Sequence, residues 1–323
     1  MRILLIGPGS IGELFGGKLA LAGNRILIYA HPDFSLLLKE NPLKLTDIFN
    51  KTHLVSNFEM APPIPELLKL DPQEFPKICL ITTKSYDLES VCNEYKPVLS
   101  KIPIIGLIQN GIGNEEILRK HFPNSTMFRI TTTHGAMRKN PTHVIHTGIG
   151  NTIICQINPS YENIPSGKKQ IMEGFSEKLQ KAGFELELEI NPMEAIWRKA
   201  LTNIGINAIG ALTQLTNGEL LKSDSLSSLI RKTINEAIII AKKIKIPLEP
   251  SFDYVQNALE VLKNTASNKN SMLQDVLSKN KTEIEFLNEK IVNFGKKLNI
   301  PTPINENLSQ LIHGLEKSYL IAL

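Results

Sequence analysis

The sequence predicts an α/β protein in two parts, with a parallel-sheet domain over residues 1–190 followed by an all-α domain over residues 191–323. Two observations support this prediction. The chain opens with a strand, a glycine-rich loop, a helix and a second strand, which is the start of a βαβ unit. Beyond about residue 190 the apolar residues adopt the helical period and keep it. A chain of 323 residues is long enough for two hydrophobic cores.

The first thirty residues predict a dinucleotide site. Residues 2–6 are a continuous apolar run, typical of a strand buried on both faces of a parallel sheet, and a helix over 13–22 and a strand over 25–29 are expected after it. Between strand and helix lies a G-x-G-x-x-G motif, made of Gly7, Pro8, Gly9, Ser10, Ile11 and Gly12. Its glycines permit a tight turn, close approach of a pyrophosphate and tight helix packing, and the helix N-terminus can receive phosphate oxygens. The domain is therefore expected to be of the Rossmann type.

The end of the second strand bears on which dinucleotide is bound. NAD sites usually have Asp or Glu there to hold the ribose hydroxyls, whereas this chain has Ala30 and His31, with Asp33 beyond a proline. The missing acid favours NADP, whose 2′-phosphate needs a cation nearby. His31 and Lys84 are candidates for that cation, and the alternative is that both are ordinary surface residues.

Further strands and helices follow in separate blocks. A strand over 77–83 ends at Lys84 and another over 102–108 ends at Gln109 and Asn110, and ligands bind at such carboxyl ends in open α/β sheets. Residues 35–76 contain several prolines and predict only short elements and loops. Strands are expected over 127–134, 143–148, 151–157 and 184–190, and helices over 193–212, 224–244, 251–265, 272–278, 282–298 and 303–318.

A polar stripe marks the first helix of the second part. Lys199, Asn203 and Asn207 are spaced four apart among Ile, Leu and Ala, so they share one helical face. Such groups are costly on an apolar helix unless they meet polar partners, and a small polar substrate is one such partner. The alternative is that the lysine reaches solvent and the asparagines bridge neighbouring helices.

Two further segments allow two interpretations each. Thr282 could cap the last long helix but one, with Glu283 in its first turn, where the helix dipole favours a carboxylate. Alternatively, Glu283 partners Lys199 or a substrate hydroxyl, and Ser271 donates to a substrate carboxylate. The pattern alone does not choose between these.

The amino-acid composition limits which binding partners and which cellular compartment are expected. The net charge is +4, no aromatic-interleaved basic tract is present, and no apolar window is long enough to span a membrane, so neither nucleic acid nor membrane is expected as a partner. Three dispersed cysteines and the lack of a signal-peptide pattern favour a reducing, cytoplasmic setting. No metal site is expected, and a mildly basic chain suits a small anionic substrate.

Over nearly its whole length the chain resembles ketopantoate reductases, also called 2-dehydropantoate 2-reductases. The matching segments are Gly7–Gly12, Thr83–Lys84, Gln109–Gly113, Thr133–Ala136, Trp197–Asn203 with Asn207, Asn217–Leu220, Ser271–Asp275 and Thr282–Ile284. The resemblance implies reduction of 2-dehydropantoate to pantoate by NADPH, for pantothenate and coenzyme A synthesis. We expect a cytoplasmic protein that is a monomer or a homodimer, since the sequence does not fix the oligomeric state.

The resemblance also implies residue roles. Lys199 matches the general acid that protonates the developing alkoxide, with Glu283 as a second catalytic candidate. Positions that hold substrate are matched by Asn110, Lys199, Asn203, Asn207, Asn217 and Ser271. Cofactor contacts are matched by the glycine motif, by Lys84 on the adenosine-phosphate side, and by Asn110, Ala136 and Glu283.

This chain departs from the family pattern in two respects. It has His31 where the family often has Arg to hold the 2′-phosphate, and the stretch between His31 and Lys84 is longer than usual. Two other functions remain open: reduction of another branched 2-keto acid, and service as a non-catalytic NADP(H)-binding regulator. The regulator would explain the glycine motif but not the set of polar residues around Lys199.

Overall fold

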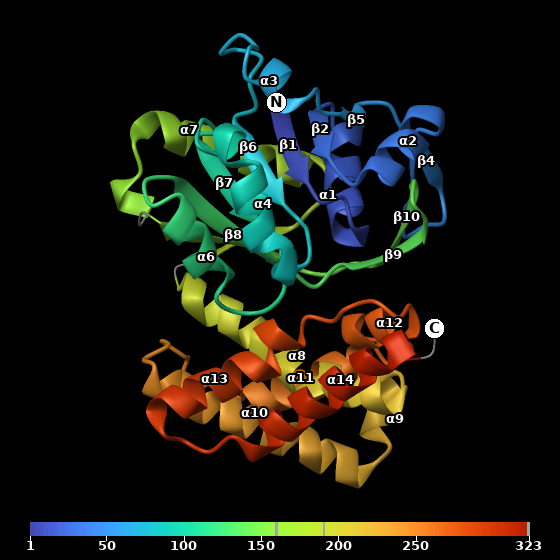
Figure 1. Ribbon diagram of the computed structural model, residues 1–323, viewed down its shortest axis with the longest axis vertical. Helices are drawn as coiled ribbons and strands as arrows, with labels where there is room; N and C mark the ends of the chain where they lie inside the picture. The colour runs from blue at the N-terminus through green and yellow to red at the C-terminus, as the bar shows by residue number, and fades with distance from the viewer. Residues whose placement is uncertain (159–160, 190, 322–323) are drawn as a thin grey trace. The chain divides into compact units, whose positions relative to one another are not determined.

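A computed structural model describes residues 1–158, 161–189 and 191–321 and divides the chain into two compact units (Figure 1). The first unit comprises Met1–Gln109 and Asn114–Pro192, and the second comprises Asn110–Gly113 and Met193–Leu323. The predicted fold class is confirmed, since a mainly parallel sheet with helices makes up the first unit and helices make up the second.

The first unit is built on an eight-stranded sheet in the order β12-β11-β8-β7-β6-β1-β2-β5. All neighbours pair in parallel except β8 and β11, which are antiparallel. The strands are β1 (Arg2–Ile6), β2 (Arg25–Tyr29), β5 (Phe58–Met60), β6 (Ile78–Ile81), β7 (Ile104–Leu107), β8 (Thr126–Thr132), β11 (Thr152–Asn158) and β12 (Leu186–Glu189).

Side chains of β1 enter two different cores, one on each face of this sheet. Ile3 and Leu5 belong to one apolar cluster and Leu4 and Ile6 to the other, as expected when successive strand residues point to opposite faces. The helices of the unit are α1 (Ser10–Leu21), α2 (Pro32–Glu40), α3 (Ile64–Leu67), α4 (Leu88–Glu94), α5 (Lys96–Leu99), α6 (Asn114–His121) and α7 (Ser166–Lys181), with 3-10 turns at Ser85–Asp87 and Tyr161–Asn163.

A second, four-stranded sheet packs against α1; it was not foreseen as a sheet, although one of its strands, β10, coincides with the strand expected over 143–148. Its order is β4-β3-β10-β9, comprising Thr52–Val55, Leu43–Thr46, His143–Gly148 and Gly135–Asn140. A Cβ added to Gly17 of α1 would lie 2.9 Å from the Leu45 side chain, so the helix and this sheet are in direct contact. The expected helix over 13–22 begins earlier, at Ser10, because the second half of the glycine motif forms its first turn.

The second unit is helical throughout its described part. Its helices are α8 (Pro192–Thr213), α9 (Asn217–Leu221), α10 (Asp224–Lys243), α11 (Tyr254–Asn264), α12 (Ser271–Leu277), α13 (Asn288–Leu298) and α14 (Pro303–Ile321), with a 3-10 turn at Ile284–Phe286.

The helix expected over 282–298 is wrong at its start. The 3-10 turn and Leu287, which has φ −120° and ψ −102°, separate Thr282 from α13. Thr282 therefore caps no long helix, and its hydroxyl accepts from the Ile284 amide at 3.3 Å instead.

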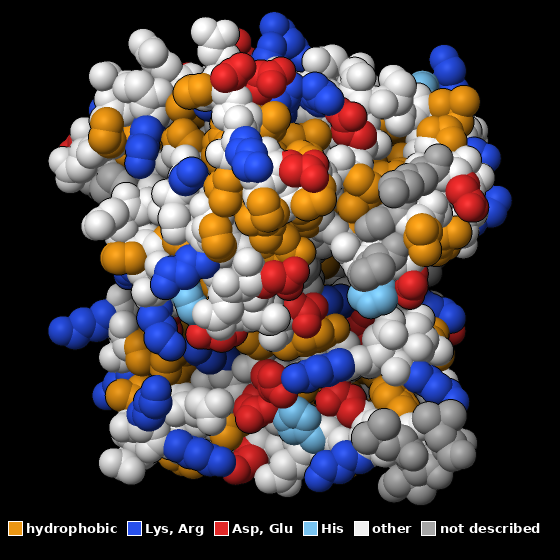
Figure 2. All heavy atoms as spheres, turned by 45° about the horizontal axis from the view of Figure 1, so that its top comes forward, with side chains coloured by type: hydrophobic (Ala, Val, Ile, Leu, Met, Phe, Trp, Pro, Cys, Tyr) orange, Lys and Arg blue, Asp and Glu red, His pale blue; other side chains and the backbone are white. Residues whose placement is uncertain are grey.

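The surface carries charges of both signs. On the face drawn in Figure 2, Lys and Arg side chains are interspersed with Asp and Glu rather than gathered into a patch of one sign. Among the described residues, no helix is both long and apolar enough to cross a membrane.

Candidate functional site

The glycine-rich loop after β1 has the geometry that the motif predicts. Gly7 has φ +81°, and a Cβ there would lie 2.1 Å from the Thr83 side chain. A Cβ on Gly12 would lie 2.4 Å from Thr82 Oγ1, whereas one on Gly9 would meet only the Thr82 carbonyl, at 3.9 Å. Gly7 and Gly12 thus allow tight packing, and the open side of Gly9 leaves room for a ligand to approach the backbone. This cradle fits a dinucleotide pyrophosphate.

The same loop starts α1 in an orientation that exposes amides. Gly9 is the N-cap, and its carbonyl accepts from the Glu13 amide at 2.8 Å. The amides of Ser10, Ile11 and Gly12 belong to the first turn, whose N–H groups have no partner within a helix and favour anions. On the other side, the Thr82 hydroxyl donates to the Gly7 carbonyl at 2.6 Å and fixes the loop on β6.

His31, at the end of β2, is engaged with a carboxylate. Its Nδ1 lies 3.3 Å from Asp33 Oδ2, and its side chain is 76% exposed. It is also the N-cap residue of α2. The candidate cation for a 2′-phosphate therefore stands beside a negative charge, which weakens its attraction for an anion.

Gln109, directly after β7, connects the carboxyl end of that strand to the residues that follow β6. Gln109 Nε2 donates to the Thr83 carbonyl at 3.0 Å and to the Lys84 carbonyl at 3.3 Å. Lys84 is half-buried, and it directly follows Thr83, whose side chain packs on Gly7. This places Lys84 on the glycine-loop side of the sheet.

The polar stripe lies on α8 as expected. Lys199 and Asn203 are half-buried, and Asn207 is 3% exposed. Asn207 Nδ2 donates to Ser271 Oγ at 3.5 Å, so the structure brings together two residues that the sequence placed 64 positions apart.

Asn270 fixes the position of Ser271 and was missed from the sequence. It caps α12 by accepting from the Leu273 amide at 2.9 Å, and its Nδ2 donates to the Ile206 carbonyl of α8 at 3.4 Å. A Cβ on Gly210 would lie 2.1 Å from that nitrogen. An asparagine directly before an apolar helical run is an N-cap signal that could have identified it.

Asn217 is buried, and only one end of its amide is paired in the described structure. Nδ2 donates to Thr265 Oγ1 at 2.7 Å, while Oδ1 is buried without a hydrogen-bond partner among the described residues. An unpaired buried oxygen is unusual, and a ligand hydroxyl would satisfy it. No hydrogen bond found in the described part of the chain links Asn217 to the Asn207–Ser271 pair.

Asn110 and Glu283 meet within the second unit. Asn110 Nδ2 donates to Glu283 Oε2 at 3.2 Å, and Glu283 is 6% exposed. The contact depends on the loop after β7, in which the Ile112 amide donates to the Phe286 carbonyl at 3.0 Å. Gly111 has φ +80°, and a Cβ there would lie 2.6 Å from Phe286, so this close approach requires glycine.

Ala136 lies on β9, in register with His146 of β10, and is half-buried. Two residues further along the same strand, Arg138 contacts the glycine-rich loop. Its Nη2 donates to the Pro8 carbonyl and forms an ion pair of 2.5 Å with Glu13. Nothing in the sequence marked Arg138 or Glu13, because their contact joins segments 125 residues apart.

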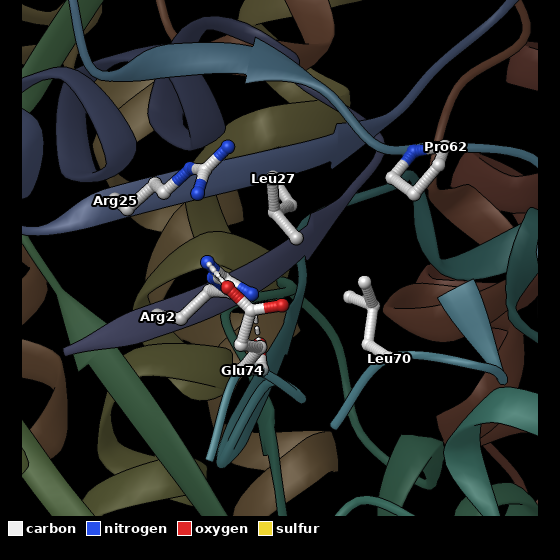
Figure 3. A pocket seen from close by; sticks show the side chains of 6 residues that line it. All are labelled: Arg2, Arg25, Leu27, Pro62, Leu70 and Glu74. Atoms are coloured by element: carbon white, nitrogen blue, oxygen red, sulfur yellow. Dashed lines mark hydrogen bonds and ion pairs between the residues drawn. The ribbon is translucent and has the colours of Figure 1, made fainter. Parts of the chain in front are cut away.

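A small pocket elsewhere in the first unit is not the dinucleotide site. It has a volume of about 180 Å³ and is lined by Arg2, Arg25, Leu27, Pro62, Leu70 and Glu74 (Figure 3). Arg2 and Arg25 begin β1 and β2, so the pocket lies at the amino ends of the strands. Nucleotides bind at the carboxyl ends, where the glycine-rich loop is.

Comparison with known families gives matches in both parts of the chain. The family described as Ketopantoate reductase PanE/ApbA matches residues 3–159, and Ketopantoate reductase PanE/ApbA C terminal matches residues 191–316. The 2-dehydropantoate 2-reductase of Pyrococcus abyssi is 32% identical over 317 residues, covering 98% of both chains. That of Vibrio cholerae is 29% identical over 324 residues, covering 99% of both.

Solved structures share the whole fold. A PanE/ApbA family ketopantoate reductase from Ralstonia eutropha has a TM-score of 0.85 at 24% identity, covering 98% of this chain and 99% of its own. A D-mandelate dehydrogenase, solved with NADH and anilino(oxo)acetate, has a TM-score of 0.86 at 23% identity with the same coverage. At these identities the likeness concerns the fold alone.

Proposed function

The chain belongs to the ketopantoate reductase family of oxidoreductases, and we propose that it reduces 2-dehydropantoate to pantoate with NADPH. The observation that carries the proposal is the match of 32% identity to a 2-dehydropantoate 2-reductase along 98% of both chains. The reaction would serve pantothenate and coenzyme A synthesis in the cytoplasm. The substrate is a small anionic 2-keto acid, the chain acts as a monomer or homodimer, and neither nucleic acid nor membrane is a partner.

Lys199 is the proposed general acid. NADPH, when bound, supplies the hydride that reduces the ketone carbon. The ketone oxygen gains negative charge in that step, and the Lys199 ammonium can stabilise it and deliver a proton, giving the alcohol and a neutral amine that solvent reprotonates. General acid assistance is typically worth about 10²–10⁴-fold in rate. A half-buried lysine on a rigid helix supports this role, because little reorganisation is needed to hold it in place.

Substrate binding is assigned to polar residues of the helical unit. Asn203 and Asn207 follow Lys199 on one face of α8, and Ser271 contacts Asn207. These donors suit the carboxylate and hydroxyl of pantoate. The buried Asn217 oxygen is a fifth candidate contact, as acceptor from a substrate hydroxyl.

Asn110 and Glu283 are proposed to act as a pair. The Glu283 carboxylate accepts from the Asn110 amide, which fixes the direction of that amide. Asn110 would then contact both substrate and cofactor, and Glu283 would help to hold the cofactor and orient the catalytic groups. Their burial and shared hydrogen bond support this assignment.

The remaining cofactor contacts are assigned to the first unit. The backbone of Gly7–Gly12 receives the pyrophosphate, Ala136 packs on the cofactor, and Lys84 and His31 face the adenosine phosphate. Residues 1–190 would thus form the NADP-binding domain and residues 191–323 the substrate domain.

Reduction of another 2-keto acid is the second candidate, because a fold this close also occurs in a D-mandelate dehydrogenase. That enzyme was solved with NADH, so the same comparison also leaves cofactor preference to experiment. The third candidate, a non-catalytic NADP(H)-binding regulator, gives no role to Lys199.

The decisive experiment is a turnover assay of the purified chain with 2-dehydropantoate and either NADPH or NADH, following loss of the reduced nicotinamide absorbance. The proposal expects the highest kcat/KM with NADPH and 2-dehydropantoate. A higher value with 2-oxoisovalerate or benzoylformate would favour the second candidate. Stoichiometric NADPH binding without turnover of any 2-keto acid would favour the regulator.

A further inference from the structure

Arg138 stands where three parts of the dinucleotide-binding unit meet. Its Nη2 donates to the carbonyl of Pro8 in the glycine-rich loop and pairs with Glu13 in the first turn of α1. Its guanidinium carbon also lies 5.7 Å from the ring centre of Phe34, three residues after His31 in α2. One arginine of the second sheet thus reaches the loop, α1 and the segment that follows β2.

The charge of Arg138 is only partly offset. Glu13 is fully buried, and burial raises the pKa of its carboxyl to about 8, although the charge of Arg138 and a hydrogen bond from it act in the opposite direction. Burial thus disfavours the charged carboxylate that would offset Arg138. The guanidinium is a cation whose side chain is 34% exposed, so it can attract an anion from solvent.

In Rossmann-type sites an arginine near the end of the second strand accommodates a 2′-phosphate. Here that position is His31, whose ring lies beside the Asp33 carboxylate. We propose that Arg138 is a specificity-determining residue that binds the 2′-phosphate of NADPH and so replaces a cation at the end of β2. This inference rests on the proposed use of NADPH.

The planar guanidinium suits this role. It offers five N–H donors in a fixed fork, and both contacts described above use Nη2. An arginine that binds phosphate through two parallel hydrogen bonds gives more specificity than a lysine, which acts as a point charge. Arg138→Lys should therefore retain only part of the preference.

The test compares two ligands that differ by one phosphate, 2′,5′-ADP and 5′-ADP, by titration calorimetry on the full chain. The wild-type chain should bind 2′,5′-ADP at least about tenfold more tightly, as expected for a charge-assisted hydrogen bond to phosphate. Arg138→Met should remove most of that difference and leave 5′-ADP affinity within about twofold. Lys139→Met, the next residue on β9 with its side chain on the opposite face, is the control and should keep the preference.

A second variant keeps the test decisive if Arg138→Met fails to fold. Arg138→Lys keeps a cation at this position but loses the guanidinium fork, so it should retain only part of the preference for 2′,5′-ADP. Equal weakening of both ligands in Arg138→Met would assign Arg138 to loop support and overturn the inference, as would an unchanged preference. A wild-type chain without any preference would overturn the NADPH proposal itself, and with it this role.

Discussion

Acidification should remove the stability that a buried histidine pair contributes to the first unit. His134 Nδ1 and His146 Nε2 lie 2.9 Å apart, and the two residues are 6% and 4% exposed. The Gly150 amide also donates to His134 Nδ1 at 3.2 Å, so this nitrogen is an acceptor and the proton of the shared bond belongs to His146. Protonating His134 Nδ1 would turn this acceptor into a donor and break the hydrogen bond from the Gly150 amide.

The size of the effect follows from the pKa of His134. Burial, then the charges of His146 and Lys18, lower this pKa from 6.5 to about 4. The unfolded chain therefore binds this proton first, and the contribution of His134 to the free energy of unfolding falls as pH drops from 6.5 towards 4 and levels off below it. The full shift corresponds to about 3 kcal/mol, of which about 2 kcal/mol is lost by pH 5. Partial screening by solvent reduces this, so we expect a loss of about 1–2 kcal/mol at pH 5.

The measurement is a series of urea unfolding curves between pH 8 and pH 4.5, read by a probe in the first unit. His134→Gln should lower stability at pH 8, and its difference from wild type should shrink as pH falls towards 4.5. His31→Gln, which changes an exposed histidine of the same unit, should leave the wild-type dependence in place. The reasoning fails if His134→Gln and wild type lose stability in parallel over this range.

Three further predictions concern activity. Lys199→Met should lower kcat by about 10²–10⁴-fold while NADPH binding is retained. The control Lys222→Met, at an exposed lysine, should leave kcat unchanged, and a near-normal kcat in Lys199→Met would reject the acid role. Ser271→Ala should raise the KM for 2-dehydropantoate about 2- to 10-fold with little effect on that for NADPH, and an unchanged KM would limit Ser271 to a packing role. Gly12→Val should weaken NADPH binding more than about tenfold, because its Cβ has no room, whereas Gly167→Ala, on an open helix face, should not; calorimetry distinguishes them, and equal affinities would contradict the assigned cradle.

The parts predicted well from sequence are those that depend on neighbours in the chain. The bounds of β1 and β2 agree with the apolar runs in the sequence. Both strands are buried on both faces, so their apolar residues are continuous rather than alternating with polar ones. The positive φ of Gly7 agrees with the motif because a tight turn is likewise a local feature. The spacing on α8 likewise predicted that Lys199, Asn203 and Asn207 share a face.

The second sheet was not predicted as a sheet, although its strand β10 matches the strand expected over 143–148, because β3 and β4 are short and β3 pairs with a strand distant in sequence. β3 and β4 have four residues each, and β3 pairs in parallel with β10, so that Lys44 lies opposite His143. Such strands carry too few residues for a period to emerge, and their stability comes from packing on α1. The proline-rich stretch, expected to hold short elements and loops, contains two of the four strands of this sheet.

The difference between local signals and long-range contacts also applies to the polar residues. Asn207 and Ser271 were selected from the sequence separately, and the structure shows that they are hydrogen-bonded. Asn270 holds Ser271 near Asn207, because it caps α12 and donates to the Ile206 carbonyl of α8. Arg138 had no local signal at all, because an arginine on a short strand next to Lys139 is typical of a solvated edge. Its significance comes from what it reaches, the Pro8 carbonyl and a fully buried Glu13. The spacing of residues along the sequence therefore does not identify a residue that acts through a long-range contact. Arg138 is such a residue, and the choice between NADPH and NADH depends on it if it binds the 2′-phosphate.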